Sequence, residues 1–190
     1  PDEPVERMMR DARWHLIGQG AHDVLRCFIA RVGMRGMGEN LRQITTKPWQ
    51  ALKLLHVAPK IPVHHEPLRA PANRLAKQVA KLAYASQAAL IRYREGILDR
   101  QFVQARIGDT ATELFMASCV YARLDSLLAN PHEDSKRQQR ELSTGVFYLQ
   151  LAEQRNHARL AALKRNLDDR QADAAERSLR ADELPLPGES

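Results

Sequence analysis

Residues 102–131 read FVQARIGDTATELFMASCVYARLDSLLANP, and this stretch predicts one long amphipathic helix. Its apolar side chains recur every three or four residues, which places them on one face of an α-helix. They are Ile107, Ala111, Leu114, Tyr121, Leu124 and Leu128. Asn130-Pro131 ends the pattern, because proline cannot continue a helix. We therefore predict a helix over 102–129 with one face in a core.

Two similar stretches flank this helix, at 71–99 and 133–167. The first has its apolar stripe at Leu75, Val79, Leu82, Ala89, Tyr93 and Ile97, and the second at Leu142, Val146, Leu149, Leu160 and Leu163. The connections are short, which makes neighbouring helices antiparallel. No stretch alternates with period two for long enough to form a strand. The prediction is an all-α fold: a short N-terminal helical remnant and an antiparallel helix bundle.

The N-terminal part predicts two further helices, at 2–13 and 21–35, with a turn at 14–20 between them. The second helix has its stripe at Val24, Leu25, Phe28, Ile29 and Val32. We expect it to end among Gly33, Gly36 and Gly38, because glycine breaks helical periodicity. Four prolines then interrupt 39–70, where only 48–56 has a helical pattern. A last weak helix is expected over 168–180.

These patterns divide the chain into four parts: an N-terminal helical part (1–38), a basic linker interrupted by prolines with a short amphipathic helix (39–70), a helical bundle (71–181) and a flexible tail (182–190). The chain begins at proline and shows no basic-then-apolar leader. We expect it to be a fragment of a longer protein.

The composition of the 190 residues is that of a globular chain, with 44% hydrophobic and 27% charged residues. It excludes a chain disordered throughout. The net charge is +6, and residues 44–108 hold 11 basic and only 3 acidic residues. Within 40–65 there is no acid, but there are Arg42, Lys47, Lys53 and Lys60. Such a segment either docks on an anionic surface or forms a solvated basic face.

Few residues suggest chemistry by their pattern alone. His64-His65-Glu66 lacks the spacing that places two imidazoles on one helix face, so we expect a solvated loop and no metal site. Cys27 and Cys119 lie on predicted apolar helix faces, and we expect both to be buried packing residues. The basic segment has no nucleic-acid-binding motif, so no nucleic acid partner is predicted.

Two N-terminal stretches resemble a known family. ERMMRDAR (6–13) and IGQGAHDVLR (17–26), followed by Phe28-Ile29-Ala30, are similar to E-R-x-x-R-D-x-R and E-G-T-N-D/E-I-L-R of the acyl-CoA dehydrogenases. The resemblance is closest to the very-long-chain branch, which extends past this point by an all-helical domain. A few residues between 91 and 102 support the same assignment, whereas 168–190 has no counterpart in it.

The resemblance implies that the family's catalytic base, a glutamate, falls on Gln19. An amide is not basic enough near neutral pH to replace a carboxylate. Gln19 is therefore either a polar turn residue or a vestigial or repurposed active-site position, and some branches place their base on an earlier helix, outside this chain. Gly20 falls on a substrate-binding position. The implied FAD-binding positions are Ala21, His22 and Asp23, where Ala21 lacks the family's threonine hydroxyl and His22 replaces the usual asparagine.

Two functions from different classes follow. The first is the C-terminal part of an FAD-dependent acyl-CoA dehydrogenase of fatty acid β-oxidation, with 1–38 as the end of its catalytic helical domain. The chain alone is then expected to be inactive, and the full-length protein to bind FAD and acyl-CoA as a homodimer. The second is a non-catalytic module for dimer assembly and for peripheral membrane or partner docking through Arg42, Lys47, Trp49, Lys53 and Lys60. The expected location is the cytoplasm in a bacterium and the mitochondrion in a eukaryote.

Overall fold

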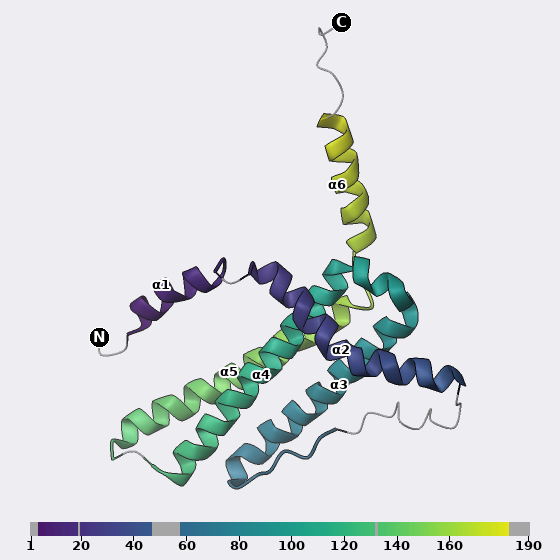
Figure 1. Ribbon diagram of the computed structural model, residues 1–190. Coiled ribbons are helices and arrows are strands. Elements are labelled where there is room, and N and C mark those ends of the chain that lie inside the picture. Colours follow the sequence, from purple (N-terminus) through teal and green to yellow (C-terminus); the bar gives the residue numbers. More distant parts are fainter. Residues whose placement is uncertain (1–3, 19, 47–57, 132, 183–190) are drawn as a thin grey trace, which may run out of the picture.

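The computed structural model of the protein describes residues 4–18, 20–46, 58–131 and 133–182. These residues form α-helices and two short 3-10 helices, without any β-strand (Figure 1). The predicted all-α fold is therefore confirmed. The predicted helix over 48–56 lies outside the described residues.

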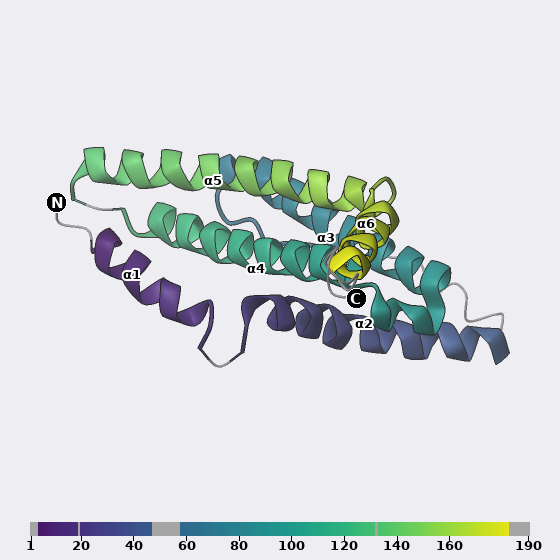
Figure 2. The ribbon, with the colours of Figure 1, turned by 90° about the horizontal axis from the view of Figure 1, so that it is seen from above.

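Three long antiparallel helices form the bundle: α3 (Arg69–Tyr93), α4 (Gln101–Ala129) and α5 (Ser135–Ala162) (Figures 1 and 2). The sequence predicts all three, because each has a continuous apolar stripe. Asp134 caps α5 by accepting hydrogen bonds from the backbone N–H groups of Lys136 and Arg137. Helix α4 is central, since its contacts with α5 and α2 are the most extensive between any two helices of the described residues.

Helix α2 (His22–Thr46) runs across the bundle at the end where α4 begins. The prediction that it ends among the glycines is wrong, because the helix continues through Gly33, Gly36 and Gly38. Glycine lowers helix stability by only about 1 kcal/mol each, and the burial of Ala30 and Met34 against the bundle compensates for this. The boundary expected at residue 38 falls inside α2, and the division of the chain into parts stays a prediction.

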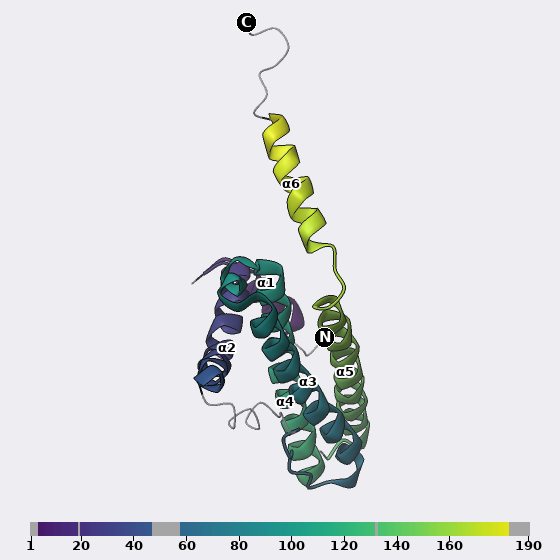
Figure 3. The ribbon, with the colours of Figure 1, turned by 90° about the vertical axis from the view of Figure 1, so that its right-hand side faces the viewer.

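Two helices extend away from the bundle. Helix α1 (Val5–His15) precedes α2, and α6 (Asp168–Asp182) projects from the opposite end of the chain (Figures 1 and 3). Their positions agree with the predicted helices to within a few residues. Helix α6 is anchored at its first turn, where Asp168 pairs with Arg106 and Asp169 pairs with Arg100.

The helix predicted over 71–99 is in fact two elements. Helix α3 ends at Tyr93, and the 3-10 helix η3 (Arg94–Asp99) follows it. Arg94 has φ 49° and ψ −128°, which is left-handed backbone that an L-residue rarely adopts. The chain turns there, and as a result Ile97 enters the core.

The core consists of two apolar clusters along the bundle. One contains Ala30, Met34, Ala89, Ile97, Val103, Ile107 and Leu163, where α2 crosses. The other contains Leu68, Ala72, Leu75, Leu114, Ala117, Tyr121, Leu124, Leu149 and Ala152, toward the end where α4 meets α5. Buried polar side chains lie between them along the helices, and we call four of these the polar layer: Gln78, Thr110, Glu113 and Asn156.

Two expectations about burial are wrong. The apolar stripe of α2 does not face the bundle: Val24, Phe28 and Val32 are 64%, 61% and 57% exposed. Cys119 is exposed and Cys27 is only half-buried. On α4 the predicted stripe is buried at Ile107, Leu114, Tyr121 and Leu124, but Cys119 lies off it. On α2 the bundle packs against a face other than the predicted stripe. For α2 that face includes Ala30 and Met34.

Helices α2 and α4 cross in close contact at Gly108. A Cβ atom added to Gly108 would lie 2.3 Å from the carbonyl oxygen of Arg26, which is backbone and cannot move aside cheaply. By contrast, a Cβ added to Gly36 on α2 would meet nothing within 4 Å. Helix packing therefore requires a glycine at position 108 but not at position 36.

We predict that Gly108→Ala lowers the free energy of unfolding by about 1–3 kcal/mol, because it overpacks the α2–α4 contact. The matched variant Gly36→Ala should raise it by about 0.5–1 kcal/mol, because alanine favours the helix. Urea unfolding followed by circular dichroism measures both. Equal effects of the two substitutions would contradict the close crossing.

Candidate functional site

The candidate site is the turn between α1 and α2, where the resembled motif lies. The turn is closed by backbone hydrogen bonds from Gly18 N–H to the Trp14 carbonyl (2.8 Å) and from His22 N–H to the Leu16 carbonyl (3.2 Å). Gly20 has φ +122°, a backbone conformation that favours glycine. The glycine of the motif is therefore explained locally by the shape of the turn.

Helix α2 begins directly after this turn. The carbonyl of Ala21 accepts the first helical hydrogen bonds, from Val24 N–H (2.9 Å) and Leu25 N–H (3.1 Å), so Ala21 occupies the N-cap position. Its methyl group cannot accept a hydrogen bond from the helix amides, as a threonine hydroxyl would. The structure thus brings the predicted site residues Gly20, Ala21, His22 and Asp23 together at the N-terminus of α2.

In this chain, the described side chains of the turn are exposed to solvent. Ala21, His22 and Asp23 are exposed and Gly20 is half-buried. Gln19, the predicted catalytic position, lies outside the described residues. The described residues of the turn offer backbone N–H groups at a helix N-terminus, an arrangement that favours an anionic group such as a phosphate.

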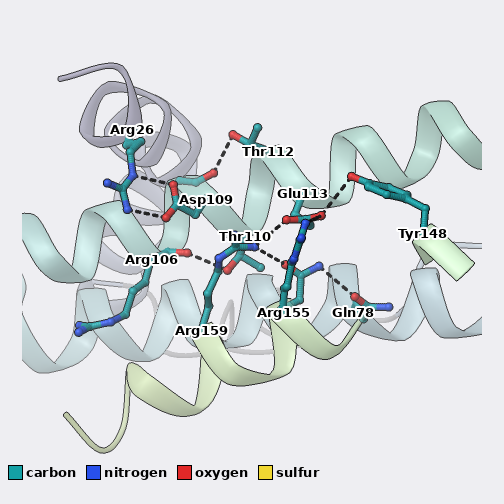
Figure 4. A network of polar contacts seen from close by, with 12 residues as sticks. Arg26, Gln78, Arg106, Asp109, Thr110, Thr112, Glu113, Tyr148, Arg155 and Arg159 are labelled. Carbon is teal, nitrogen blue, oxygen red and sulfur yellow. Dashed lines mark hydrogen bonds and ion pairs between the residues drawn. The ribbon is translucent and has the colours of Figure 1, made fainter. Parts of the chain in front are cut away.

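An ion pair that sequence analysis missed fixes α2 to α4 one turn after the site. Arg26 donates two hydrogen bonds to Asp109, from Nε to Oδ1 (2.6 Å) and from Nη2 to Oδ2 (2.5 Å) (Figure 4). Its Nη1 also donates to Asp23 Oδ1 at 2.9 Å. The hydrogen bond to Asp109 raises the pKa of the Arg26 guanidinium, against the opposing effect of burial. Arg26 thus joins the first turn of α2 to the bundle.

A second contact between the same two helices involves a buried amide. Gln104 is fully buried on α4, and its side-chain carbonyl accepts from Arg31 Nε at 2.8 Å. Its amide nitrogen donates to the carbonyls of Ile97 (2.7 Å) and Leu98 (2.9 Å), in the 3-10 helix η3. Arg31 Nη2 also donates to the Leu98 carbonyl at 3.0 Å. This network fixes α2, η3 and α4 relative to one another.

Glu113 is the most buried carboxylate among the described residues, at 8% exposure. Arg159 donates to its Oε2 at 3.0 Å, and Tyr148 OH donates to its Oε1 at 3.1 Å, while Arg155 Nη1 lies 3.5 Å away (Figure 4). Burial acts to raise the pKa of Glu113, but the hydrogen bonds from Arg159 and Tyr148 and the two positive charges outweigh it. The pKa is therefore lowered. Since all three partners come from α5, Glu113 holds α4 against α5.

The histidine pair has a role that its spacing did not suggest. His64 Nδ1 lies 2.7 Å from Asp125 Oδ2, and His65 Nδ1 lies 2.9 Å from Asp125 Oδ1. Both imidazoles thus contact one carboxylate of α4, and hydrogen bonding to His65 and His64 lowers the pKa of Asp125. Nearby, Tyr121 OH donates to the Pro62 carbonyl. The segment before the short 3-10 helix η2 (Glu66–Leu68) is therefore attached to the bundle and is not a free loop.

No metal site is found in the part of the chain that the structure describes, where no three His, Cys, Asp or Glu side chains gather suitably. The described helices also include none that is long and apolar enough to cross a membrane.

Only two of the predicted docking residues are described. Arg42 lies on the exposed side of α2, with Nη2 3.5 Å from Glu95 of η3. Lys60 is exposed and lies near Lys77 of α3, at the edge of a shallow pocket. Lys47, Trp49 and Lys53 lie outside the described residues. The docking surface therefore stays a prediction.

We predict that Glu113→Gln lowers the free energy of unfolding at pH 7 by about 2 kcal/mol, because two arginines lose their buried counter-charge. Because the pKa of Glu113 is lowered in the folded state, its contribution to the free energy of unfolding is fully present above the ordinary carboxyl pKa, about 4.3. It is lost as the pH falls through the lower folded-state value. The difference between wild type and Glu113→Gln should therefore vanish in acid.

Urea unfolding at several pH values measures this difference. The control is Glu176→Gln, which removes an exposed ion pair with Arg180 on α6 and should change stability by less than about 0.5 kcal/mol. A Glu113→Gln effect that is equally large at pH 7 and in acid would contradict the charge-based explanation.

Known proteins resemble this chain over most of its length. The sequence profile of the family described as "ACAD9/ACADV, C-terminal domain" matches residues 66–180. This range includes the first 13 residues of α6, for which the sequence alone showed no counterpart.

The curated relatives include the mitochondrial very long-chain specific acyl-CoA dehydrogenases of Macaca fascicularis and Homo sapiens, each 26% identical over 152 residues, and that of Mus musculus, 25% identical. The matches cover 70% of this chain and 23% of each relative. The chain thus spans less than a quarter of the length of these enzymes. Because the profile covers more than half of the chain, and its range spans the whole α3–α5 bundle, the chain belongs to the ACAD9/ACADV C-terminal domain family of the acyl-CoA dehydrogenases.

Proposed function

We propose that this chain is the C-terminal part of an FAD-dependent acyl-CoA dehydrogenase that acts on long-chain acyl-CoA in fatty acid β-oxidation. In this proposal, residues 1–38 complete the catalytic helical domain, and residues 71–181 form the helical extension. The observation that carries the proposal is the motif glycine Gly20, which lies in left-handed backbone at the N-terminus of α2.

The exposed apolar surface of α1 and α2 supports this assignment. Val24, Phe28 and Val32 form one stripe on α2, and Trp14 and Ile17 lie exposed beside the turn. Contiguous apolar surface of this kind marks an interface in soluble proteins. We infer that an upstream catalytic body, which holds the acyl-CoA, covers these side chains in the full-length protein.

The chemistry at the motif differs from that of the family. In an acyl-CoA dehydrogenase a base removes the α-proton of the acyl thioester while a hydride leaves the β-carbon. Gln19 cannot be that base, because an amide oxygen is too weakly basic near neutral pH. Either a carboxylate on an earlier helix removes the proton, or the protein has kept the dehydrogenase frame without its base.

The residues at the start of α2 fit FAD in part. Gly20 lets the backbone approach a ligand closely, and the first-turn N–H groups of α2 suit a phosphate oxygen. Ala21 contributes no hydroxyl, so contact there is limited to the backbone. FAD, when bound, supplies the hydride acceptor. The role of residues 20–23 in this proposal is to hold one part of the cofactor.

A second function, peripheral membrane docking through 40–65, is favoured by the basic and acid-free sequence of that segment. Trp49 together with Leu52 and Leu55 gives it the pattern of an interfacial helix. This function is compatible with the first, with a homodimer and with a mitochondrial location in a eukaryote.

The first test uses the full-length product of the gene that encodes this chain. We expect the purified protein to show the absorbance of bound flavin, and a long-chain acyl-CoA to bleach it if a base outside this chain acts. If bound flavin is not bleached, Gln19→Glu should restore bleaching, because a carboxylate then stands at the family's base position.

The control is the 190-residue chain itself, which should retain no FAD, because the upstream part is needed to enclose the cofactor. Full-length protein that binds no flavin, or an isolated chain that retains it stoichiometrically, would contradict the proposal.

The docking function predicts co-sedimentation of the chain with vesicles containing phosphatidylserine, decreasing with salt. Each lysine near an anionic surface contributes about 1 kcal/mol. The double variant Lys47→Glu and Lys53→Glu should therefore bind at least tenfold more weakly. Lys136→Glu with Lys164→Glu, an equal charge change on the bundle, should bind nearly as wild type. Binding that depends on neither anionic lipid nor salt would contradict docking.

A further inference from the structure

Helix α2, which begins at the motif, is joined to the bundle by specific hydrogen bonds. Arg26 of α2 forms two hydrogen bonds with Asp109 of α4 and a third with Asp23, in the first turn of α2. Asp109 is 22% exposed and Arg26 28%, so their interaction is partly shielded from water. Asp109 belongs to the C-terminal family domain, whereas Asp23 and Arg26 belong to the motif.

The backbones of the two helices are in contact at the same point. Gly108, the residue before Asp109, lies against the backbone carbonyl of Arg26. This contact brings the two helices closest where the Arg26–Asp109 pair forms. Farther along α2, the Arg31–Gln104 hydrogen bond and the buried Ala30 and Met34 fix the direction of the helix.

The turn itself, in its described residues Leu16–Gly18 and Gly20–His22, forms no hydrogen bond with the bundle. Its described side chains are exposed apart from the half-buried Gly18 and Gly20, and its backbone hydrogen bonds are local. Within the chain, its position therefore depends on the start of α2. At the start of α2, Arg26 contacts the bundle through both its side chain and its backbone carbonyl, whereas Val24 and Leu25 lie exposed.

We propose that Asp109, beside Gly108 on α4, is a positioning residue for Gly20–Asp23 of the motif turn. Through its two hydrogen bonds to Arg26, the helical extension holds the start of α2 where the cofactor-side residues Gly20–Asp23 are needed. This inference rests on the proposed function for its biological role, but the physical coupling is a property of this chain. Through Asp109 and Arg26, the helical extension then helps to position the dehydrogenase site without touching the reacting atoms.

Amide hydrogen exchange of the 190-residue chain, read by mass spectrometry, tests the coupling. In Asp109→Asn, peptides covering residues 18–30 should exchange about tenfold faster, because a charged hydrogen-bonded pair is lost. Peptides from α5 should be unchanged. Asp109→Glu keeps the carboxylate and should restore most of the protection. Glu153→Gln, which removes the Arg74–Glu153 pair between α3 and α5, should leave residues 18–30 unchanged.

Unchanged exchange of residues 18–30 in Asp109→Asn would overturn the inference. So would an increase spread equally over α5, because that would indicate a merely structural role.

The role in the site is tested separately on the full-length protein, by the rate at which FAD dissociates. Asp109→Asn should release FAD several-fold faster than wild type, and Glu153→Gln should not. Equal release from wild type and Asp109→Asn would overturn the role in the site. Absence of flavin from the wild type would instead contradict the proposed function, and the exchange measurement then decides the positioning of the turn alone.

Discussion

The contact of α2 with α4 at Gly108 is the constraint on which the rest of this structure depends. It brings two backbones together, and it sets a guanidinium beside a carboxylate on the adjacent residue. On one side of this contact lies a helix that begins with a family motif, and on the other lies a three-helix bundle. Farther along α2, the Arg31–Gln104 hydrogen bond and the buried Ala30 and Met34 continue this contact, while the apolar stripe of α2 stays exposed. The architecture is therefore a rigid bundle that presents a short turn at its edge.

The two ends of the bundle differ in what they bury. The end near α2 combines an apolar cluster with ion pairs and amide contacts that join α2, η3, α4 and the first turn of α6. The far end is mostly apolar, and the segment 58–65 is attached there by Tyr121 and by Asp125, which contacts both His64 and His65. Most polar contacts between the described helices thus lie near the candidate site and in the polar layer, while the ion pairs Arg74–Glu153 and Arg123–Glu141 join helices toward the far end. This distribution agrees with a domain that has to hold one neighbour in a defined position.

Local periodicity was sufficient to predict the three long helices, their antiparallel order and the turn at 14–20, because these features depend on neighbouring residues. The motif was found for the same reason. The end of α2 was not predicted correctly, because its continuation through three glycines depends on the packing of Ala30 and Met34 against distant helices. Arg26 and Asp109 are 83 residues apart, and His65 and Asp125 are 60 apart. No pattern in the sequence pairs them. A glycine inside a strongly helical stretch, followed by an aspartate, was the one available signal for the crossing at Gly108.

Glu113 has a consequence for how the bundle is aligned. The apolar residues of α5 in the core, among them Val146, Leu149 and Ala152, are spaced about one turn apart, so a slide of one turn, about 5.4 Å, would again place apolar side chains in the core. After that slide, Tyr148, Arg155 and Arg159 would no longer reach the carboxylate, which would remain buried without donors at a large energetic cost. The apolar clusters supply most of the attraction between the helices. Glu113, together with the buried Asn156–Gln78 hydrogen bond and the close fit of Gly145 against Leu124, therefore selects one register of α5, and with it the place where α5 ends and α6 leaves the bundle.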